Sequence, residues 1–189
     1  WLKTPLSEIS LLYNKTIGII GFGEIGQLVA QRALAFGMKV IYHKRIPLSQ
    51  EQENLLGVKY SSIDKLLKEA DFITLHLPHT AETANLLGKR EFEQMKRGAI
   101  LVNTSRGGVI DEEALADALR TGKLVGAGLD VFQQEPLPVN SPLVKLNNVT
   151  LSPHIASAPA MGIVEQLRSI ERNVFAVLSG DLPPNNRIL

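Results

Sequence analysis

The sequence contains no cysteine among its 189 residues, which excludes disulfide bonds and thiolate metal sites. No apolar run approaches the roughly 20 residues that a membrane-spanning helix requires. The formal net charge of +1 gives no overall attraction to nucleic acids or membrane surfaces. The opening residues, WLKTPLSEIS, lack the charged and apolar segments of a secretory signal. We therefore expect a cytoplasmic protein with no metal, nucleic-acid or membrane ligand.

Short apolar segments alternate with amphipathic segments along the chain, in which hydrophobic residues make up 44%. Near-continuous apolar segments that end at glycine or polar residues are typical of strands buried on both faces. Strands are expected at 15–21, 38–43, 71–78, 99–105, 125–132 and 148–154, and helices at 24–37, 61–70, 89–98, 111–124 and 160–180. This alternation predicts a doubly wound parallel α/β sheet of the Rossmann type, which binds its ligand beyond the carboxyl ends of the strands.

The expected helix at 24–37 has apolar residues at helical spacing. The residues at that spacing are Ile25, Leu28, Val29, Arg32 and Ala33, all apolar except Arg32. Gly37 is expected to end the helix, because glycine readily takes the left-handed conformation found after a helix C-terminus.

The motif GFGEIG joins the first expected strand to this helix. In a G-x-G-x-x-G turn, the first glycine permits the tight turn, the second admits the pyrophosphate, and the third brings helix and strand together. These are Gly21, Gly23 and Gly26, and Glu24 and Ile25 between them complete the candidate cofactor contacts. The alternative is a glycine turn without a ligand, which the strand–turn–helix context disfavours.

The stretch VIYHKR ends the second expected strand, where NAD-binding proteins place a carboxylate for the ribose hydroxyls. Here the residues are His43, Lys44 and Arg45. A guanidinium suits a phosphate, so the stretch predicts NADP as the preferred cofactor over NAD. The alternative is a solvated basic loop without a ligand.

Three later segments place polar side chains just past expected strands: NTSRGGVID, GLDVFQQEP and SPHIAS. They carry a cation, Arg106, a carboxylate, Glu135, and an imidazole, His154. Reduction of a 2-oxo acid needs a cation for the substrate carboxylate and a proton donor for the carbonyl oxygen. An imidazole supplies that proton near neutral pH when a carboxylate stabilises its charged form. Taken singly, each residue is equally well explained as part of an ordinary loop.

These motifs, together with GFGEIG and in this order, resemble the NAD(P)-binding domain of the D-isomer-specific 2-hydroxyacid dehydrogenases. The resemblance implies an enzyme in which Arg106 binds the substrate carboxylate, Glu135 is the partner acid and His154 is the general acid/base. It also implies that Asp130 binds the nicotinamide carboxamide. Further cofactor contacts implied by the resemblance are Thr104 and Ser105 on the nicotinamide ribose side, and Leu77, Pro78 and Thr83 around the adenosine.

In that family the nucleotide domain lies between two halves of a substrate-binding domain. The resemblance thus implies that residues 1–189 are one isolated dinucleotide-binding domain, which binds its cofactor but turns over little substrate. It further implies a homodimer that acts on a small 2-oxo or 2-hydroxy acid such as glyoxylate or hydroxypyruvate. Two alternatives remain open: a nucleotide-sensing corepressor that binds proteins, and an enzyme like phosphite dehydrogenase.

Overall fold

The computed structural model describes residues 11–156 and 162–181, so residues 160 and 161 of the expected last helix lie outside the described part. The chain divides into two units, Trp1–Pro153 and His154–Leu189, and each is described by itself.

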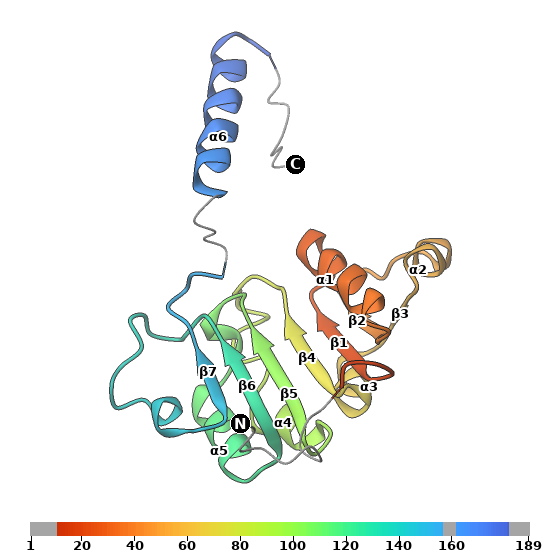
Figure 1. Ribbon diagram of the computed structural model, residues 1–189, viewed down its shortest axis with the longest axis vertical. Coiled ribbons are helices and arrows are strands. Elements are labelled where there is room, and N and C mark those ends of the chain that lie inside the picture. Colours follow the sequence, from red (N-terminus) through yellow and green to blue (C-terminus); the bar gives the residue numbers. More distant parts are fainter. Residues whose placement is uncertain (1–10, 157–161, 182–189) are drawn as a thin grey trace, which may run out of the picture. The chain divides into compact units, whose positions relative to one another are not determined.

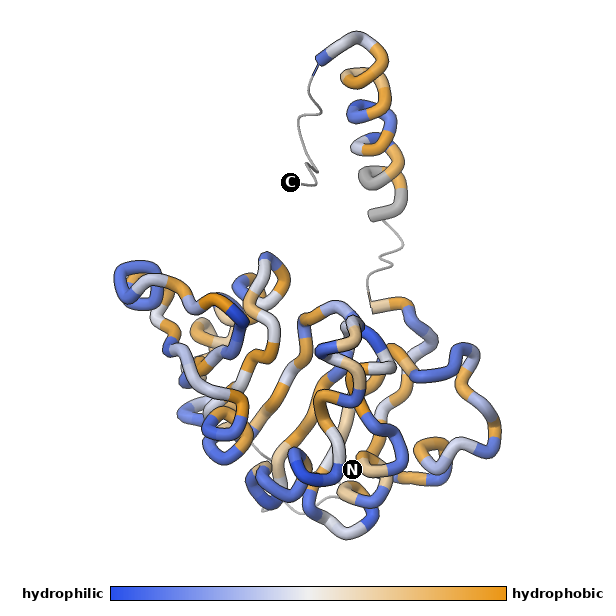
Figure 2. Tube along the Cα trace, turned by 180° about the vertical axis from the view of Figure 1, so that it is seen from behind, coloured by the Kyte–Doolittle hydropathy of each residue, from blue (hydrophilic) through white to orange (hydrophobic). Residues whose placement is uncertain are grey.

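The first unit is built on one seven-stranded sheet in which every pair of neighbouring strands is parallel (Figure 1). The strand order is β3-β2-β1-β4-β5-β6-β7. The strands are β1 (Thr16–Ile20), β2 (Lys39–His43), β3 (Val58–Tyr60), β4 (Phe72–Leu75), β5 (Ala99–Asn103), β6 (Leu124–Leu129) and β7 (Val149–Leu151). Figure 2 shows these strands as mainly hydrophobic stretches joined by hydrophilic loops.

Helices cover the sheet from two sides. They are α1 (Glu24–Ala35), α2 (Gln50–Leu56), α3 (Ile63–Glu69), α4 (Lys89–Gln94) and α5 (Glu112–Arg120), with 3-10 turns η2 (Gly107–Val109) and η3 (Pro142–Lys145). Successive residues of β1 belong to two separate hydrophobic cores. Ile19 belongs to the core that includes residues of α1, whereas Ile20 belongs to the core that includes residues of α3, α4 and α5. The predicted doubly wound parallel sheet is therefore confirmed.

The strand order reverses between β1 and β4. From β1 the chain builds β2 and β3 on one side, and it then crosses to β4 on the other. In such a sheet the loops at the carboxyl ends of the two strands diverge, and ligands bind in the crevice between them. The glycine turn follows β1, so it lies at this position.

Of the residues named at helical spacing in α1, Ala33 is buried and Val29 is half-buried. Ile25 and Leu28 are 64% and 46% exposed, and the buried residues of α1 are Gly26, Ala30 and Ala33. Small residues at the buried positions let the helix lie close to the strand, since a Cβ on Gly26 would lie 2.4 Å from the Gly21 carbonyl oxygen. The end of the helix is as predicted, because Gly37 adopts a positive φ of 72°.

The elements α2 and β3 lie between 46 and 60, where no helix or strand was expected. The helix α2 begins at a capping box, in which Ser49 and Gln52 satisfy each other's backbone N–H groups, and it ends at Gly57 with φ of 68°. These capping signals are present in the sequence, but the segment QEQENLL has no clear apolar periodicity.

The second unit contains α6 (Gly162–Leu178), a helix of 17 residues. Hydrophobic and hydrophilic residues alternate along the part of it that is coloured in Figure 2. No helix in the described part of the chain is both long and apolar enough to cross a membrane.

Candidate functional site

The turn after β1 depends on glycine at its first position. Gly21 has φ of 94°, and a Cβ there would lie 2.2 Å from the carbonyl oxygen of His76 at the end of β4. The Gly21 amide donates to the carbonyl of His43, at 2.9 Å. The turn is thus held against the ends of both neighbouring strands.

Gly23 and Gly26 have different roles in the same turn. Gly23 is the residue before α1, and a Cβ added to it would meet no atom within 4 Å. A Cβ on Gly26 would lie 2.4 Å from the carbonyl oxygen of Gly21, so Gly26 permits the close packing of helix on strand. Open space beside the free N–H groups of a helix N-terminus suits a pyrophosphate. The turn therefore fits a dinucleotide, with Glu24 and Ile25 exposed beside it in the first turn of α1.

The basic stretch follows β2, next to the glycine turn. His43 Nδ1 lies 3.0 Å from the carbonyl oxygen of Ser61 and carries the proton in this bond, because a carbonyl only accepts. Lys44 is half-buried and Arg45 is exposed. Within the described residues, neither forms an ion pair. Both cations are therefore available to an anionic ligand.

The loop after β4 faces the basic stretch. The pKa of Glu82 is lowered, mainly by the hydrogen bond from the Thr80 hydroxyl and in smaller part by the charge of Arg45. The Thr83 hydroxyl donates to the Pro78 carbonyl and accepts from the Thr80 amide, both at 2.7 Å. Thr83 therefore holds the shape of the loop with its own hydroxyl.

The two histidines of this loop, His76 and His79, both contact neighbouring residues of the protein. Burial lowers the pKa of His76, whose Nε2 lies 2.9 Å from the Thr74 hydroxyl. The ring of His79 packs on Gly108, where a Cβ would approach ring atoms to 2.7 Å. Leu77, between them, packs against the larger core.

Asn103 shapes the turn after β5, and the sequence analysis did not single it out. Its side chain is 1% exposed. Its Oδ1 accepts from the amide and the hydroxyl of Ser105, at 3.0 and 2.8 Å, and its Nδ2 donates to the Arg106 carbonyl at 3.0 Å. Ser105 is therefore bound within the turn, while Thr104 and Arg106 are exposed. The Arg106 guanidinium also donates to the Ser105 carbonyl, at 2.6 Å.

The loops after β5 and β6 pack directly on each other. A Cβ on Gly107 would lie 1.8 Å from the carbonyl carbon of Phe132, so only glycine fits there. The side chain of Gln133 donates through Nε2 to the Ile110 carbonyl at 2.7 Å, and its backbone N–H donates to Glu112 Oε1 at 2.6 Å. Glu135 is exposed in the same loop, and its Oε1 accepts from the Phe132 amide at 3.0 Å. Arg106 and Glu135 thus lie on two mutually supported loops.

Asp130 directly follows β6 and is 3% exposed. Its Oδ1 accepts a 2.6 Å hydrogen bond from the hydroxyl of Ser152, which follows β7. Its amide donates to the Asn103 carbonyl at 3.0 Å. The ends of β5, β6 and β7 are therefore joined around this carboxylate.

His154 begins the second unit, so its side chain is described separately from Arg106 and Glu135. It is exposed and has a positive φ of 55°, which is uncommon for a residue with a side chain. Among the described residues, no cluster of His, Asp and Glu could hold a metal ion.

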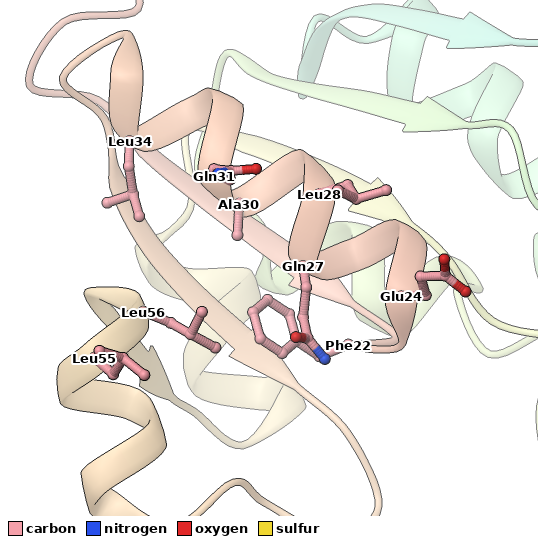
Figure 3. A pocket seen from close by; sticks show the side chains of 9 residues that line it. All are labelled: Phe22, Glu24, Gln27, Leu28, Ala30, Gln31, Leu34, Leu55 and Leu56. Atoms are coloured by element: carbon pink, nitrogen blue, oxygen red, sulfur yellow. The ribbon is translucent and has the colours of Figure 1, made fainter.

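One hollow of about 440 Å³ lies between α1 and α2 and is lined mainly by apolar side chains (Figure 3). It is separate from the loops that carry Arg106 and Asp130, but Phe22 of the glycine turn is part of its wall. Its lining residues are Phe22, Glu24, Gln27, Leu28, Ala30, Gln31, Leu34, Leu55 and Leu56.

A parallel sheet that reverses its order beside a glycine turn, with that turn opening into a helix, defines a dinucleotide-binding domain. A family profile described as "D-isomer specific 2-hydroxyacid dehydrogenase, NAD binding domain" matches residues 1–156. The chain therefore belongs to the D-isomer specific 2-hydroxyacid dehydrogenase family, and it carries that family's domain for a nicotinamide cofactor.

Individual relatives agree with this assignment. The glyoxylate reductase of Korarchaeum cryptofilum is 48% identical over 174 residues, which cover 92% of this chain and 52% of the relative. The structure of a glyoxylate reductase from Paecilomyes thermophila matches with a TM-score of 0.82 and 40% identity, over 92% of this chain and 52% of that one. That of D-lactate dehydrogenase with NAD+ from Lactobacillus jensenii matches with a TM-score of 0.87 and 34% identity, over 98% and 60%. The chain spans about half the length of the curated relatives it matches.

Proposed function

We propose that this chain is the cofactor domain of an enzyme that transfers hydride from NADPH to a small 2-oxo acid such as glyoxylate or hydroxypyruvate. The observation that carries the cofactor preference is the contact between the Gly21 amide and the His43 carbonyl, which brings the basic stretch beside the glycine turn. A dinucleotide with its pyrophosphate on this turn has its adenosine ribose near the end of β2. Lys44 and Arg45 would then bind a 2′-phosphate.

The remaining site residues divide between cofactor and substrate. Asp130 would bind the nicotinamide carboxamide, and Thr104 and Ser105 would lie along the adjoining ribose. Leu77, Pro78 and the loop held by Thr83 would line the adenosine. When bound, the nicotinamide supplies the hydride.

For the substrate, Arg106 would hold the carboxylate in a charge-assisted contact. As hydride reaches the carbonyl carbon, His154 would give a proton to the carbonyl oxygen, which leaves a hydroxyl group. Glu135 would orient the imidazole and stabilise its charged form. Support for these roles comes from the order of the motifs and from the positions of Arg106 and Glu135 on adjoining loops.

We infer further that residues 1–189 form one domain whose substrate-binding partner lies elsewhere in the full-length protein. The full-length protein would be a cytoplasmic homodimer, an inference supported by the family resemblance. Light scattering on the full-length protein tests the oligomeric state.

Activity is tested by following the oxidation of NADPH in the presence of glyoxylate, hydroxypyruvate or pyruvate. The full-length protein should reduce at least one of them, whereas residues 1–189 alone should bind NADPH with little turnover. Arg106→Gln should lower kcat/KM by about a hundredfold or more, mainly through KM. Arg97→Gln is the matched control, because Arg97 is an exposed arginine before the amino end of β5, whereas Arg106 follows the carboxyl end of the same strand. Equal activity of both variants would contradict the role of Arg106.

A further inference from the structure

We propose that Tyr42 is a positioning residue for cofactor selection, because it ties the loop that carries Lys44 and Arg45 to the glycine turn. The inference rests on the proposed preference for NADPH. It concerns a side chain that is fully buried, so its effect on the cofactor would be indirect.

The ring of Tyr42 makes the connection to the glycine turn. Tyr42 is 0% exposed and stacks on Phe22, with ring centroids 4.2 Å apart and planes inclined by 28°. Phe22 lies between Gly21 and Gly23, and its ring packs beneath α1 (Figure 3). The position of Tyr42 is therefore fixed relative to the residues proposed to bind the pyrophosphate.

The hydroxyl of Tyr42 makes the connection to the basic loop. It accepts a 2.8 Å hydrogen bond from the amide of Leu48, and it donates a 2.8 Å hydrogen bond to Glu53 Oε1. The same oxygen of Glu53 accepts from the Tyr60 amide at 2.9 Å. Burial and the bond to Glu53 raise the pKa of Tyr42 to about 12, so the hydroxyl keeps its proton and both bonds persist near neutral pH.

The loop is consequently anchored at both ends. His43 is held by the Ser61 carbonyl and by the Gly21 amide, and Leu48 is held by the Tyr42 hydroxyl. The segment between these anchors is residues 44–47, which includes both cations and Pro47. A guanidinium binds a phosphate through a planar pair of N–H groups, so its attachment point must be well placed. Freeing Leu48 would let the cations spread over many positions and would weaken their contact with a 2′-phosphate.

The test compares the affinities of the full-length protein for NADPH and NADH. Tyr42→Phe keeps the stacked ring and removes only the hydroxyl. The dissociation constant for NADPH should rise by about fivefold to tenfold, the effect of one lost ordering hydrogen bond, whereas that for NADH should change less than about twofold. NADH has no 2′-phosphate, so it does not depend on the basic loop.

Two control variants separate this role from general stability. Tyr60→Phe also removes a hydroxyl, one that makes no hydrogen bond with any described residue. The ring of Tyr60 lies beside those of Tyr42 and His43, with ring centroids 5.8 Å apart in each pair. It should leave both affinities unchanged. Glu53→Gln keeps an acceptor oxygen for Tyr42 and should retain the preference, whereas Glu53→Ala should lose it as Tyr42→Phe does. Thermal unfolding of each variant shows whether it is folded. If Tyr42→Phe is not folded, the affinities of Glu53→Ala are compared with the wild type instead.

The outcomes distinguish the inference from the function on which it rests. If the wild type binds NADH as tightly as NADPH, the proposed cofactor preference is wrong. A second outcome is that the wild type prefers NADPH, that Arg45→Ala loses this preference, and that Tyr42→Phe keeps it. In that case only the role of Tyr42 is wrong. An equal loss of both affinities in Tyr42→Phe would also overturn that role, because it would reveal a purely structural residue.

Discussion

The hydroxyl of Ser152 donates a 2.6 Å hydrogen bond to Asp130 Oδ1 and so joins the ends of β7 and β6. Asp130 is the proposed partner of the nicotinamide carboxamide, and it is 3% exposed. If Asp130 binds the cofactor as proposed, Ser152 acts on it indirectly, by holding the Asp130 carboxylate.

Replacing Ser152 should weaken both cofactors equally. In Ser152→Ala the Asp130 carboxylate loses a charged hydrogen bond, and the dissociation constants of NADPH and NADH should each rise by about threefold to tenfold. The ratio between them should not change, because the 2′-phosphate is bound elsewhere. Thr150→Ala in β7, the strand that Ser152 follows, is the control, since Thr150 is exposed and should have no effect. A change in the ratio would argue against the proposed role of Asp130.

The first two glycines of the turn should respond differently to the same substitution. Gly21→Ala brings a methyl group against the His76 carbonyl at a positive φ, and it should lower the free energy of unfolding by about 2–4 kcal/mol. Gly23→Ala meets no protein atom and should change stability by less than about 1 kcal/mol, yet weaken dinucleotide binding at least tenfold by filling the space for the pyrophosphate. Chemical denaturation and cofactor titration measure the two effects. Wild-type cofactor affinity in Gly23→Ala would place the pyrophosphate elsewhere.

Asn103 should matter for the substrate more than for the cofactor. Asn103→Asp keeps an acceptor for Ser105 but loses the donor that holds the Arg106 carbonyl. In the full-length protein, kcat/KM for the 2-oxo acid should fall by about tenfold to a hundredfold, because small displacements of a substrate-binding group are costly. Cofactor affinity should stay within a few-fold of wild type. Unaltered kcat/KM in a folded variant would show that the turn does not position Arg106.

Asp71 should make stability depend on pH. Burial acts to raise the pKa of this carboxyl, but hydrogen bonds from the Thr16 amide and Lys96 outweigh it, so the pKa is lowered. Its contribution is therefore full above the unfolded-state pKa of about 3.9, and it is lost as the pH falls through the folded-state pKa.

The corresponding variant is Asp71→Asn. At pH 7 it should unfold more easily than wild type by about 1–2 kcal/mol, allowing for partial exposure of the ion pair with Lys96. The difference should disappear in strong acid, where Asp71 is protonated. Asp64→Asn is the control, because the Asp64–Arg90 pair is exposed and contributes little. A difference that persists unchanged in acid would exclude the carboxylate as its source.

The sequence predicted the fold largely because the main strands are apolar runs that end at glycine or polar residues. It failed between 46 and 60, where α2 is polar and β3 has only three residues. Short elements of this kind are stabilised by caps and by neighbours that are distant in sequence, so periodicity does not show them. In α1 the residues named at helical spacing included Ala33, which is buried, but not Ala30, which is buried as well.

The motifs predict the residues of the candidate site, but they do not indicate the contacts that hold those residues in place. Gly21, Gly23 and Gly26 have the local geometry that the motif predicts. The supporting residues Tyr42, Asn103 and Ser152 were not singled out. Two of them bind partners 11 and 22 residues away, Glu53 and Asp130, and no local spacing indicates such pairs. Asn103 binds locally, but its motif drew attention to Arg106 instead.

The most direct test of the account is calorimetric titration of NADPH and NADH into residues 1–189. NADPH should bind at least about tenfold more tightly, the effect of one or two charge-assisted hydrogen bonds to the 2′-phosphate, and Arg45→Ala should remove most of the difference. Equal affinity for the two cofactors would contradict the central claim, because the basic stretch after β2 would then be surface charge without a ligand.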